Sequence, residues 1–166
     1  MLLYLRKLSL EDGYDVFSML KSIGLSENAF TNPVHNMDYN EFRGWLLERY
    51  NWDLCKDLPE NYVRQTIYWL YLNDIPIGIG KIRYALTEES KLFGGNIGYA
   101  IAPDYRGKGY GNEILRLLLE KVKESKISET LITVEKYNYP SKAIVEKNGG
   151  YLLGENDIRW FFTFDL

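Results

Sequence analysis

The sequence is poor in the two residue types that build disulfide scaffolds and many structural metal centres. Its 166 residues contain one cysteine, Cys55, and one histidine, His35. A single cysteine excludes an internal disulfide and favours a reducing compartment, so we expect a cytoplasmic protein. With so few cysteine and histidine ligands, we expect no metal centre.

Long hydrophobic runs and an excess of positive charge are also missing. The longest apolar run, residues 67–72, is far too short to span a bilayer. The apolar stretch that opens the chain is short, and basic residues follow it rather than precede it, unlike a signal peptide. The net charge of −3 and the pI of about 5.3 argue against a general nucleic-acid binder. We therefore expect neither a membrane nor a nucleic acid as partner, whereas a cationic amine is compatible with the acidic balance.

What the chain does have is the composition of a folded core. Hydrophobic residues make up 46% of the sequence, which is typical of a globular chain and not of a disordered one. The length suits one domain over residues 1–166, and no repeat, low-complexity tract or linker divides it.

Apolar periodicity and turn residues predict alternating strands and helices. In the first half we expect a strand over 2–8, a helix from a Ser9 cap to Gly24, a helix over 39–50, a hairpin of 66–72 and 75–85 around Asn73-Asp74, a polar loop over 87–90 and a strand over 92–101. In the second half we expect a helix over 111–122, a strand over 129–135, a helix from an Asn138 cap to Asn148, and a closing hairpin of 151–153 and 158–164. Because strand, helix and strand follow one another, the strand over 129–135 should run parallel to the one before the long helix.

The stretch that carries chemistry is the glycine-rich segment before the long helix. Arg106 and Lys108 stand there among Gly107, Gly109 and Gly111. Such a loop leaves unpaired backbone N–H groups at a helix start, where the helix dipole adds positive charge, so it suits a phosphate-bearing ligand. The alternative is a plain strand–helix turn in which the glycines supply positive φ.

Two common phosphate loops do not fit this segment. A P-loop needs serine or threonine after Gly107-Lys108, where this chain has Gly109. A dinucleotide fingerprint needs a third glycine where Asn112 stands.

A third pattern does fit. Arg106, Gly109 and Gly111 match, position by position, the pattern Arg/Gln-x-x-Gly-x-Gly/Ala between a strand and a helix. This resembles motif A of the GCN5-related N-acetyltransferase (GNAT) family. A second motif of that family is matched near the C-terminus by Asn138, Ser141, Lys147 and Gly149.

The resemblance implies an α/β GNAT fold. Such a fold has a mixed, mostly antiparallel sheet of six to seven strands that is flanked by helices. It also has a V-shaped split between the fourth and fifth strands, here residues 96–101 and 131–134.

The resemblance further implies acetyl-CoA as cosubstrate. Its pantetheine arm would pair like an extra strand with the backbone of Tyr99, Ala100 and Ile101, and an N–H near Ile101 would polarise the thioester carbonyl. Asn138 and Ser141 would lie beside the arm. The pyrophosphate would be held by the loop residues Arg106, Gly107, Lys108, Gly109, Tyr110, Gly111 and Asn112.

The reaction implied is direct acyl transfer to a primary amine, on a small molecule or at a protein N-terminus, with no metal. The tyrosine that serves the family as acid falls on Val145, which has no proton to give. The thiolate could leave unassisted, or another tyrosine could replace the acid, namely Tyr99, Tyr137, Tyr139 or Tyr151. Our candidates are Tyr99 for the acid and, for the base, Glu135 at the end of the strand over 129–135.

Several alternatives stay open at this point. His35 could act as a base, or it could be a surface loop residue without a catalytic role. The aromatic side chains of residues 26–62 could line the acceptor pocket or fill the core. A non-catalytic acyl-CoA-binding or sensory module and a nucleotide-binding enzyme are rival functions. The oligomeric state is also open, a homodimer included.

Overall fold

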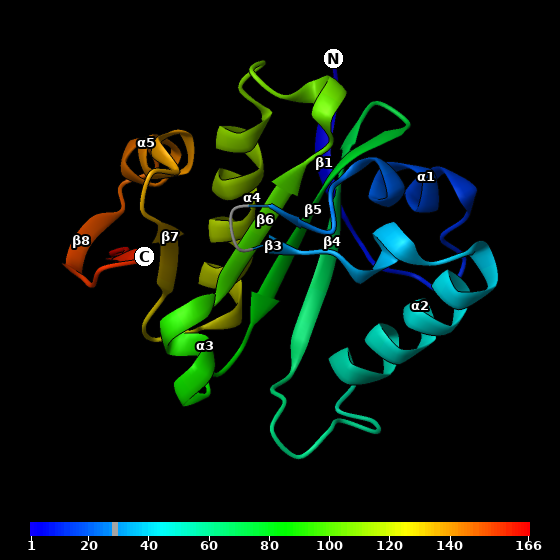
Figure 1. Cartoon of the computed structure of the whole chain (residues 1–166), viewed down its shortest axis with the longest axis horizontal. Helices are drawn as coiled ribbons and strands as arrows, with labels where there is room; N and C mark the ends of the chain where they lie inside the picture. Colours follow the sequence, from blue (N-terminus) through cyan, green and yellow to red (C-terminus); the bar gives the residue numbers. More distant parts are fainter. Residues whose placement is uncertain (28–29) are drawn as a thin grey trace.

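The computed structural model describes residues 1–27 and 30–166, and its strands form a larger and a smaller antiparallel sheet (Figure 1). The larger sheet has the order β1-β4-β5-β6, with β1 (Leu3–Lys7), β4 (Gln65–Leu72), β5 (Ile75–Arg83) and β6 (Ile97–Ile101). The smaller sheet has the order β7-β9-β8, with β7 (Leu131–Glu135), β8 (Tyr151–Glu155) and β9 (Arg159–Thr163). A short pair, β2 (Ser26–Glu27) and β3 (Phe30–Thr31), forms a separate two-stranded sheet, and β3 contacts β6.

Helices cover both faces of the larger sheet, so the expected α/β class, with an antiparallel sheet flanked by helices, is confirmed (Figure 1). One face carries α1 (Tyr14–Ser22) and α2 (Tyr39–Asp53). The other carries α4 (Tyr110–Ser125), with α5 (Tyr139–Lys147) beside it. Shorter helical segments are η1 (Pro33–Asn36), α3 (Glu88–Phe93) and η2 (Pro103–Tyr105). No helix in the described ranges is long and apolar enough to cross a membrane.

Two hydrophobic cores lie against the two faces of the larger sheet. Ile79 of β5 belongs to the core beneath α1 and α2, whereas Ile82 belongs to the core beneath α4 and the smaller sheet. Successive side chains of a strand point to opposite faces. Lys81 and Arg83 therefore lie on the same face of β5 as Ile79, on the side of α2, where both residues line cavities.

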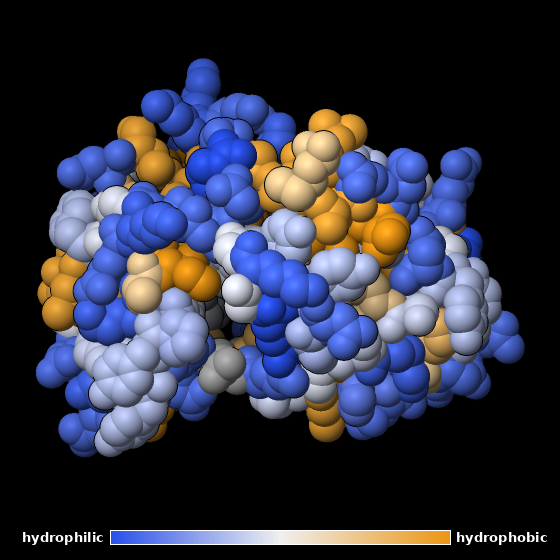
Figure 2. Space-filling model, turned by 90° about the horizontal axis from the view of Figure 1, so that it is seen from above, coloured by the Kyte–Doolittle hydropathy of each residue, from blue (hydrophilic) through white to orange (hydrophobic). Residues whose placement is uncertain are grey.

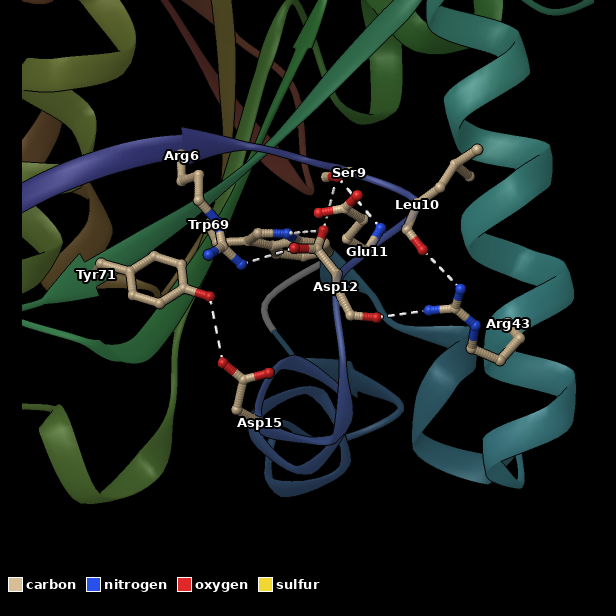
Figure 3. A network of polar contacts seen from close by, with 9 residues as sticks. All are labelled: Arg6, Ser9, Leu10, Glu11, Asp12, Asp15, Arg43, Trp69 and Tyr71. Atoms are coloured by element: carbon tan, nitrogen blue, oxygen red, sulfur yellow. Dashed lines mark hydrogen bonds and ion pairs between the residues drawn. The ribbon is translucent and has the colours of Figure 1, made fainter.

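The segment between β1 and α1 differs from the prediction. We expected Ser9 to cap a helix with Asp12 in its first turn, and this was wrong because α1 begins at Tyr14, after an N-cap at Gly13. The carboxylate of Asp12 instead accepts hydrogen bonds from the Ser9 N–H (2.8 Å), from Arg6 (2.7 Å) and from the indole of Trp69 (2.6 Å) (Figure 3). These bonds hold the turn in a non-helical form.

The segment before β6 also differs. Residues 87–90 are not a loop throughout, because α3 begins at Glu88, and β6 starts at Ile97 instead of at residue 92. A capping box explains the helix: the Ser90 N–H donates to the Thr87 hydroxyl (3.1 Å) and the Thr87 N–H donates to the Ser90 hydroxyl (2.8 Å).

The remaining predicted elements are present, with boundaries shifted by a few residues. The hairpin of β4 and β5 turns at Asn73, which takes a positive φ of 54°. The helix predicted over 39–50 extends to Asp53 and starts with its own capping box, formed by Asp38 and Glu41. Asn138 caps α5 as expected, since its side chain accepts from the Ser141 N–H at 3.3 Å.

Candidate functional site

The strands β6 and β7 meet at one end and are unpaired beyond it. The Asn96 N–H donates to the Leu131 carbonyl (2.7 Å), and the Leu131 N–H donates to the Asn96 side chain (2.8 Å). Gly95 is required at this junction, since a Cβ there would lie 2.2 Å from the Leu131 carbonyl oxygen. Within the described residues the two strands share no ladder, only an isolated bridge between Gly95 and Ile132, so their facing edges are left without strand partners.

A cavity of about 760 Å³ lies along this unpaired edge. Its walls come from the face of β6, from the loop that follows β6, from the first turns of α4 and α5, and from Lys81 and Arg83 of β5. Figure 2 shows the molecule of Figure 1 from above, and its surface is hollowed between the left-hand and the right-hand part of the view. A cavity of this size is typical of small-molecule and cofactor sites.

The loop between β6 and α4 has a conformation that needs its glycines. Gly107 and Gly109 take positive φ values of 71° and 87°, and Gly109 is the N-cap of α4. In the described part of the chain, the N–H groups of residues 107–111 donate to no acceptor. The chain is exposed from Arg106 to Gly109. A helix start with free amides beside a cavity can receive a phosphate group.

The loop's two cations are partly engaged by the protein. Arg106 donates through Nε to the Ile101 carbonyl (2.8 Å) and forms an ion pair with Glu27. Lys108 donates to the Asp104 carbonyl (2.7 Å), and it is not among the residues that line the cavity. Tyr110 does not line it either and packs beside Tyr105.

Most of the predicted cofactor residues come together at this cavity. Those that line it are Tyr99, Ala100, Ile101, Arg106, Gly107, Gly109, Gly111, Asn112, Asn138 and Ser141. Gly111 also lets α5 approach α4, because a Cβ there would lie 2.8 Å from the Ile144 side chain.

Tyr99 is the tyrosine among the proposed acids that faces the cavity. Its hydroxyl lies 3.2 Å from the Ser141 hydroxyl. Burial raises the pKa of Tyr99 to about 12, and the hydrogen bond with Ser141 opposes this only in part. The phenol therefore keeps its proton near neutral pH and can donate it.

The other candidates for acid and base lie elsewhere. Val145 is fully buried in the core. Tyr137, Tyr139 and Tyr151 are exposed and do not line the cavity. Glu135 does not line the cavity either. It is the last residue of β7 and lies on the same face of the strand as Thr133, which does line the cavity.

His35 has a structural environment. Its Nδ1 lies 3.0 Å from the Lys21 carbonyl and 2.9 Å from the Ile23 carbonyl, at the end of α1. His35 lines neither this cavity nor the one beside it.

A second cavity, of about 370 Å³, adjoins the first on the side of α2. The two share wall residues, among them Lys81, Arg83 and Phe93. The aromatic residues of 26–62 divide accordingly: Trp45 and Tyr62 line the smaller cavity and Phe30 the larger one, while Phe42 is fully buried in the core. The aromatic residues of this segment therefore divide between cavity walls and core.

Four cations of the two cavity walls were missed by sequence reasoning: Arg49, Lys81, Arg83 and Arg159. The one signal in the sequence is the alternation of Lys81 and Arg83 with Ile82 on a strand that is otherwise apolar. Among the described residues, no group of three or more histidine, cysteine or acidic side chains could hold a metal ion.

Solved structures similar to this one include acetyltransferases. A spermidine N-acetyltransferase chimera from Vibrio cholerae and hSSAT is 16% identical, with a TM-score of 0.66 over 98% of this chain and 94% of that one. A ribosomal L7/L12 alpha-N-protein acetyltransferase in complex with coenzyme A is 16% identical, with a TM-score of 0.70 over 97% and 92%. A Campylobacter jejuni N-acetyltransferase in complex with acetyl coenzyme A is 11% identical, with a TM-score of 0.66 over 99% of both chains. At such identities these likenesses show the fold alone.

Two comparisons were made at the level of sequence. No curated protein matches the chain. The family model described as the acetyltransferase (GNAT) domain matches residues 3–150, nearly the whole chain. The chain therefore belongs to the GNAT acetyltransferase family.

Proposed function

We propose that residues 1–166 form one domain that transfers the acetyl group of acetyl-CoA to a primary amine, on a small molecule or at a protein N-terminus. The observation that carries this proposal is the run of free amides over residues 107–111 at the start of α4, where Gly107, Gly109 and Gly111 line the cavity. Unpaired N–H groups at a helix start suit the pyrophosphate of the coenzyme.

The wall residues fit the rest of the coenzyme. The backbone of Tyr99, Ala100 and Ile101 borders the unpaired edge of β6, where an extended pantetheine arm can pair as an added strand. When bound, acetyl-CoA would supply the activated acyl group as a thioester. Asn138 and Ser141 lie on the α5 side of the same cavity.

The chain's own contribution to the chemistry is modest. A backbone N–H near Ile101 would polarise the carbonyl, and Tyr99, as the acid, would donate a hydrogen bond from its phenol to the departing thiolate. Glu135 remains our proposal for the base, acting through water because it does not line the cavity. No metal is needed for these steps.

A non-catalytic acyl-CoA-binding or sensory module is the second candidate. The observation in its favour is that a fully buried valine, Val145, occupies the position of the tyrosine that serves the family as general acid. Incubation with acetyl-CoA and a panel of primary amines separates the two functions: release of coenzyme indicates an enzyme, and binding without release indicates the module. A nucleotide-binding enzyme instead predicts better protection against heat by ATP or NAD than by coenzyme A.

The loop assignment is tested by Gly109→Asp. The added carboxylate would face the phosphates, so we expect acetyl-CoA affinity, measured by calorimetric titration, to fall at least about tenfold. The matched control is Gly149→Asp. Gly149 has nearly the same φ (86° against 87°), equally open space for a Cβ, and lies outside the cavity. Both variants carry the same backbone strain, so equal affinities for acetyl-CoA would remove the loop assignment.

A further inference from the structure

The smaller cavity is lined by cations from separate parts of the chain. Arg49 comes from α2, whereas Lys81 and Arg83 come from neighbouring positions on one face of β5. The one carboxylate in this wall is Glu89, an exposed residue of α3 that forms no ion pair within residues 1–27 and 30–166. The wall therefore carries an excess of positive charge.

The protein neutralises only part of this charge. In the described part of the chain, Lys81 and Arg83 form no ion pair, and Arg49 pairs only with Glu48, at 3.5 Å. Lys81 lies 4.4 Å from the centre of the Phe30 ring and donates to the Thr31 carbonyl at 3.3 Å. Arg83 donates to the Gly95 carbonyl at 3.1 Å. These contacts fix the side chains in position but leave their charges without a counterion.

A fourth cation lies on the opposite side of the larger cavity. Arg159 is buried, its guanidinium lies 5.5 Å from the centre of the Phe93 ring, and its Nε has no hydrogen-bond partner among the described residues. Phe93 borders both cavities. A buried guanidinium without a carboxylate partner costs free energy unless an anion joins it.

The surroundings of Lys81 disfavour its positive charge. Loss of water contact, then the like charges of Arg83 and Arg49, lower the pKa of Lys81 to about 7. An anion bound in the smaller cavity would raise the pKa of Lys81 again, because its negative charge offsets the like charges of Arg83 and Arg49. Lysine and arginine side chains are seldom withdrawn from water without a partner of opposite charge.

The position of the cluster separates it from the pyrophosphate loop. Lys81 pairs with Gly98 of β6, three residues before Ile101, so it lies about 10 Å along the strand from the end that leads to the loop. Arg83 lies further still, since its N–H donates to the Asn96 carbonyl. The cluster therefore faces the part of the site that the acceptor would occupy.

We infer that the acceptor is a small primary amine that also carries an anionic group, a carboxylate or a phosphate, which is held by Arg49, Lys81 and Arg83. This inference rests on the proposed acetyl transfer and adds the chemical class of the acceptor. The volume of about 370 Å³ suits a small molecule. A polyamine without an anionic group would meet like charges and be disfavoured.

The test compares amines that differ only in the anionic group. The pairs are β-alanine against β-alaninamide and 2-aminoethyl phosphate against ethanolamine, with spermidine as a purely cationic probe. Binding is measured by titration of each probe into the protein, with and without saturating coenzyme A, and turnover by coenzyme release. We expect at least one probe with an anionic group to bind and react at least about tenfold better than its partner without that group. The better pair tells carboxylate from phosphate.

Variants show whether the cluster causes the preference. Lys81→Met is expected to remove most of the preference for the anionic probe, and Lys81→Arg to restore it. Lys91→Met is the control, because Lys91 is an exposed lysine of α3 that pairs with Glu88 and lies outside both walls. Acetyl-CoA and its 3′-dephospho form should lose equally little affinity in Lys81→Met.

Three outcomes would overturn the inference. They are equal binding of the partners with and without the anionic group, a preference that survives in Lys81→Met, and a loss of acetyl-CoA affinity in that variant that dephospho-coenzyme does not share. The third would assign the cations to the 3′-phosphate of the coenzyme. Failure of the protein to bind acetyl-CoA at all would refute the proposed function instead, and the comparison of probes without coenzyme would still decide the inference.

Discussion

Tyr99 combines a position in the cavity wall with a proton that it holds firmly. Its hydroxyl contacts one protein group, the Ser141 hydroxyl at 3.2 Å, and burial raises its pKa to about 12. A phenol in that state is protonated throughout the neutral range and can stabilise a departing thiolate by donating a hydrogen bond, whereas full transfer of its proton is uphill because the pKa of a thiol is several units lower.

We expect Tyr99→Phe to lower kcat by about 10- to 100-fold, because a hydrogen bond to a charged group contributes about 1.5–3 kcal/mol. Acetyl-CoA affinity should change little, and stability should fall by about 1 kcal/mol for the lost hydrogen bond. Steady-state kinetics and titration measure the two effects. Tyr151→Phe is the control, since Tyr151 lies outside the cavity and its hydroxyl contacts Asp165.

The sign of the pH effect follows from the raised pKa: Tyr99 stays protonated up to about pH 11, so a kcat that falls between pH 7 and 9 would contradict its role as acid.

At the scale of elements, the turn between β1 and α1 ties three parts of the fold together. Asp12 is buried and accepts from Arg6 on β1 and from Trp69 on β4 (Figure 3). The carbonyls of Asp12 and Leu10 accept from Arg43 of α2, at 2.7 and 2.6 Å. The turn thereby positions α1 and α2 over the sheet face that carries Lys81 and Arg83.

We expect Asp12→Ala to lower the free energy of unfolding by about 3 kcal/mol, because it leaves the buried Trp69 N–H without an acceptor and Arg6 without its counterion. Urea denaturation measures the change. Asp15→Ala is the matched control: Asp15 is exposed and accepts a single long hydrogen bond, from Tyr71 at 3.4 Å, so its loss should stay under about 1 kcal/mol. Similar losses in both variants would show that the Asp12 network is not what holds this turn.

At the scale of the whole molecule, the two sheets are joined at Asn96. Its side chain donates to the Arg83 carbonyl (3.0 Å) and accepts from the Leu131 N–H (2.8 Å), so one buried residue links β5, β6 and β7. The cavity opens directly beyond this junction. Its width therefore depends on how firmly the sheets are held there.

We expect Asn96→Ala to lower the free energy of unfolding by about 2 kcal/mol and, in addition, to weaken acetyl-CoA binding, because the strand edges that border the cavity are no longer held. Asn156→Ala is the control, since Asn156 accepts from the Ile158 and Arg159 N–H groups within the smaller sheet alone. That variant should lose stability and keep its affinity. An Asn96→Ala protein with unchanged affinity would mean that the junction supports the fold and not the site.

The sequence alone determined the local features of this protein. The loop over 106–112, the long helix after it and the cap at Asn138 depend on neighbours within a few residues, and glycine at 107 and 109 is matched by the positive φ found there. The family pattern could be read for the same reason, since both motifs are short and continuous in the chain.

Tertiary structure alone decided which side chains converge. Arg49, Lys81 and Arg159 lie far apart in the sequence and meet at adjoining cavities only because the strands and α2 pack as they do. The same packing leaves Glu135 outside the cavity wall. Local backbone preferences fix a turn or a cap, but the meeting of distant side chains follows from burial and strand pairing across the whole chain, which no local pattern encodes.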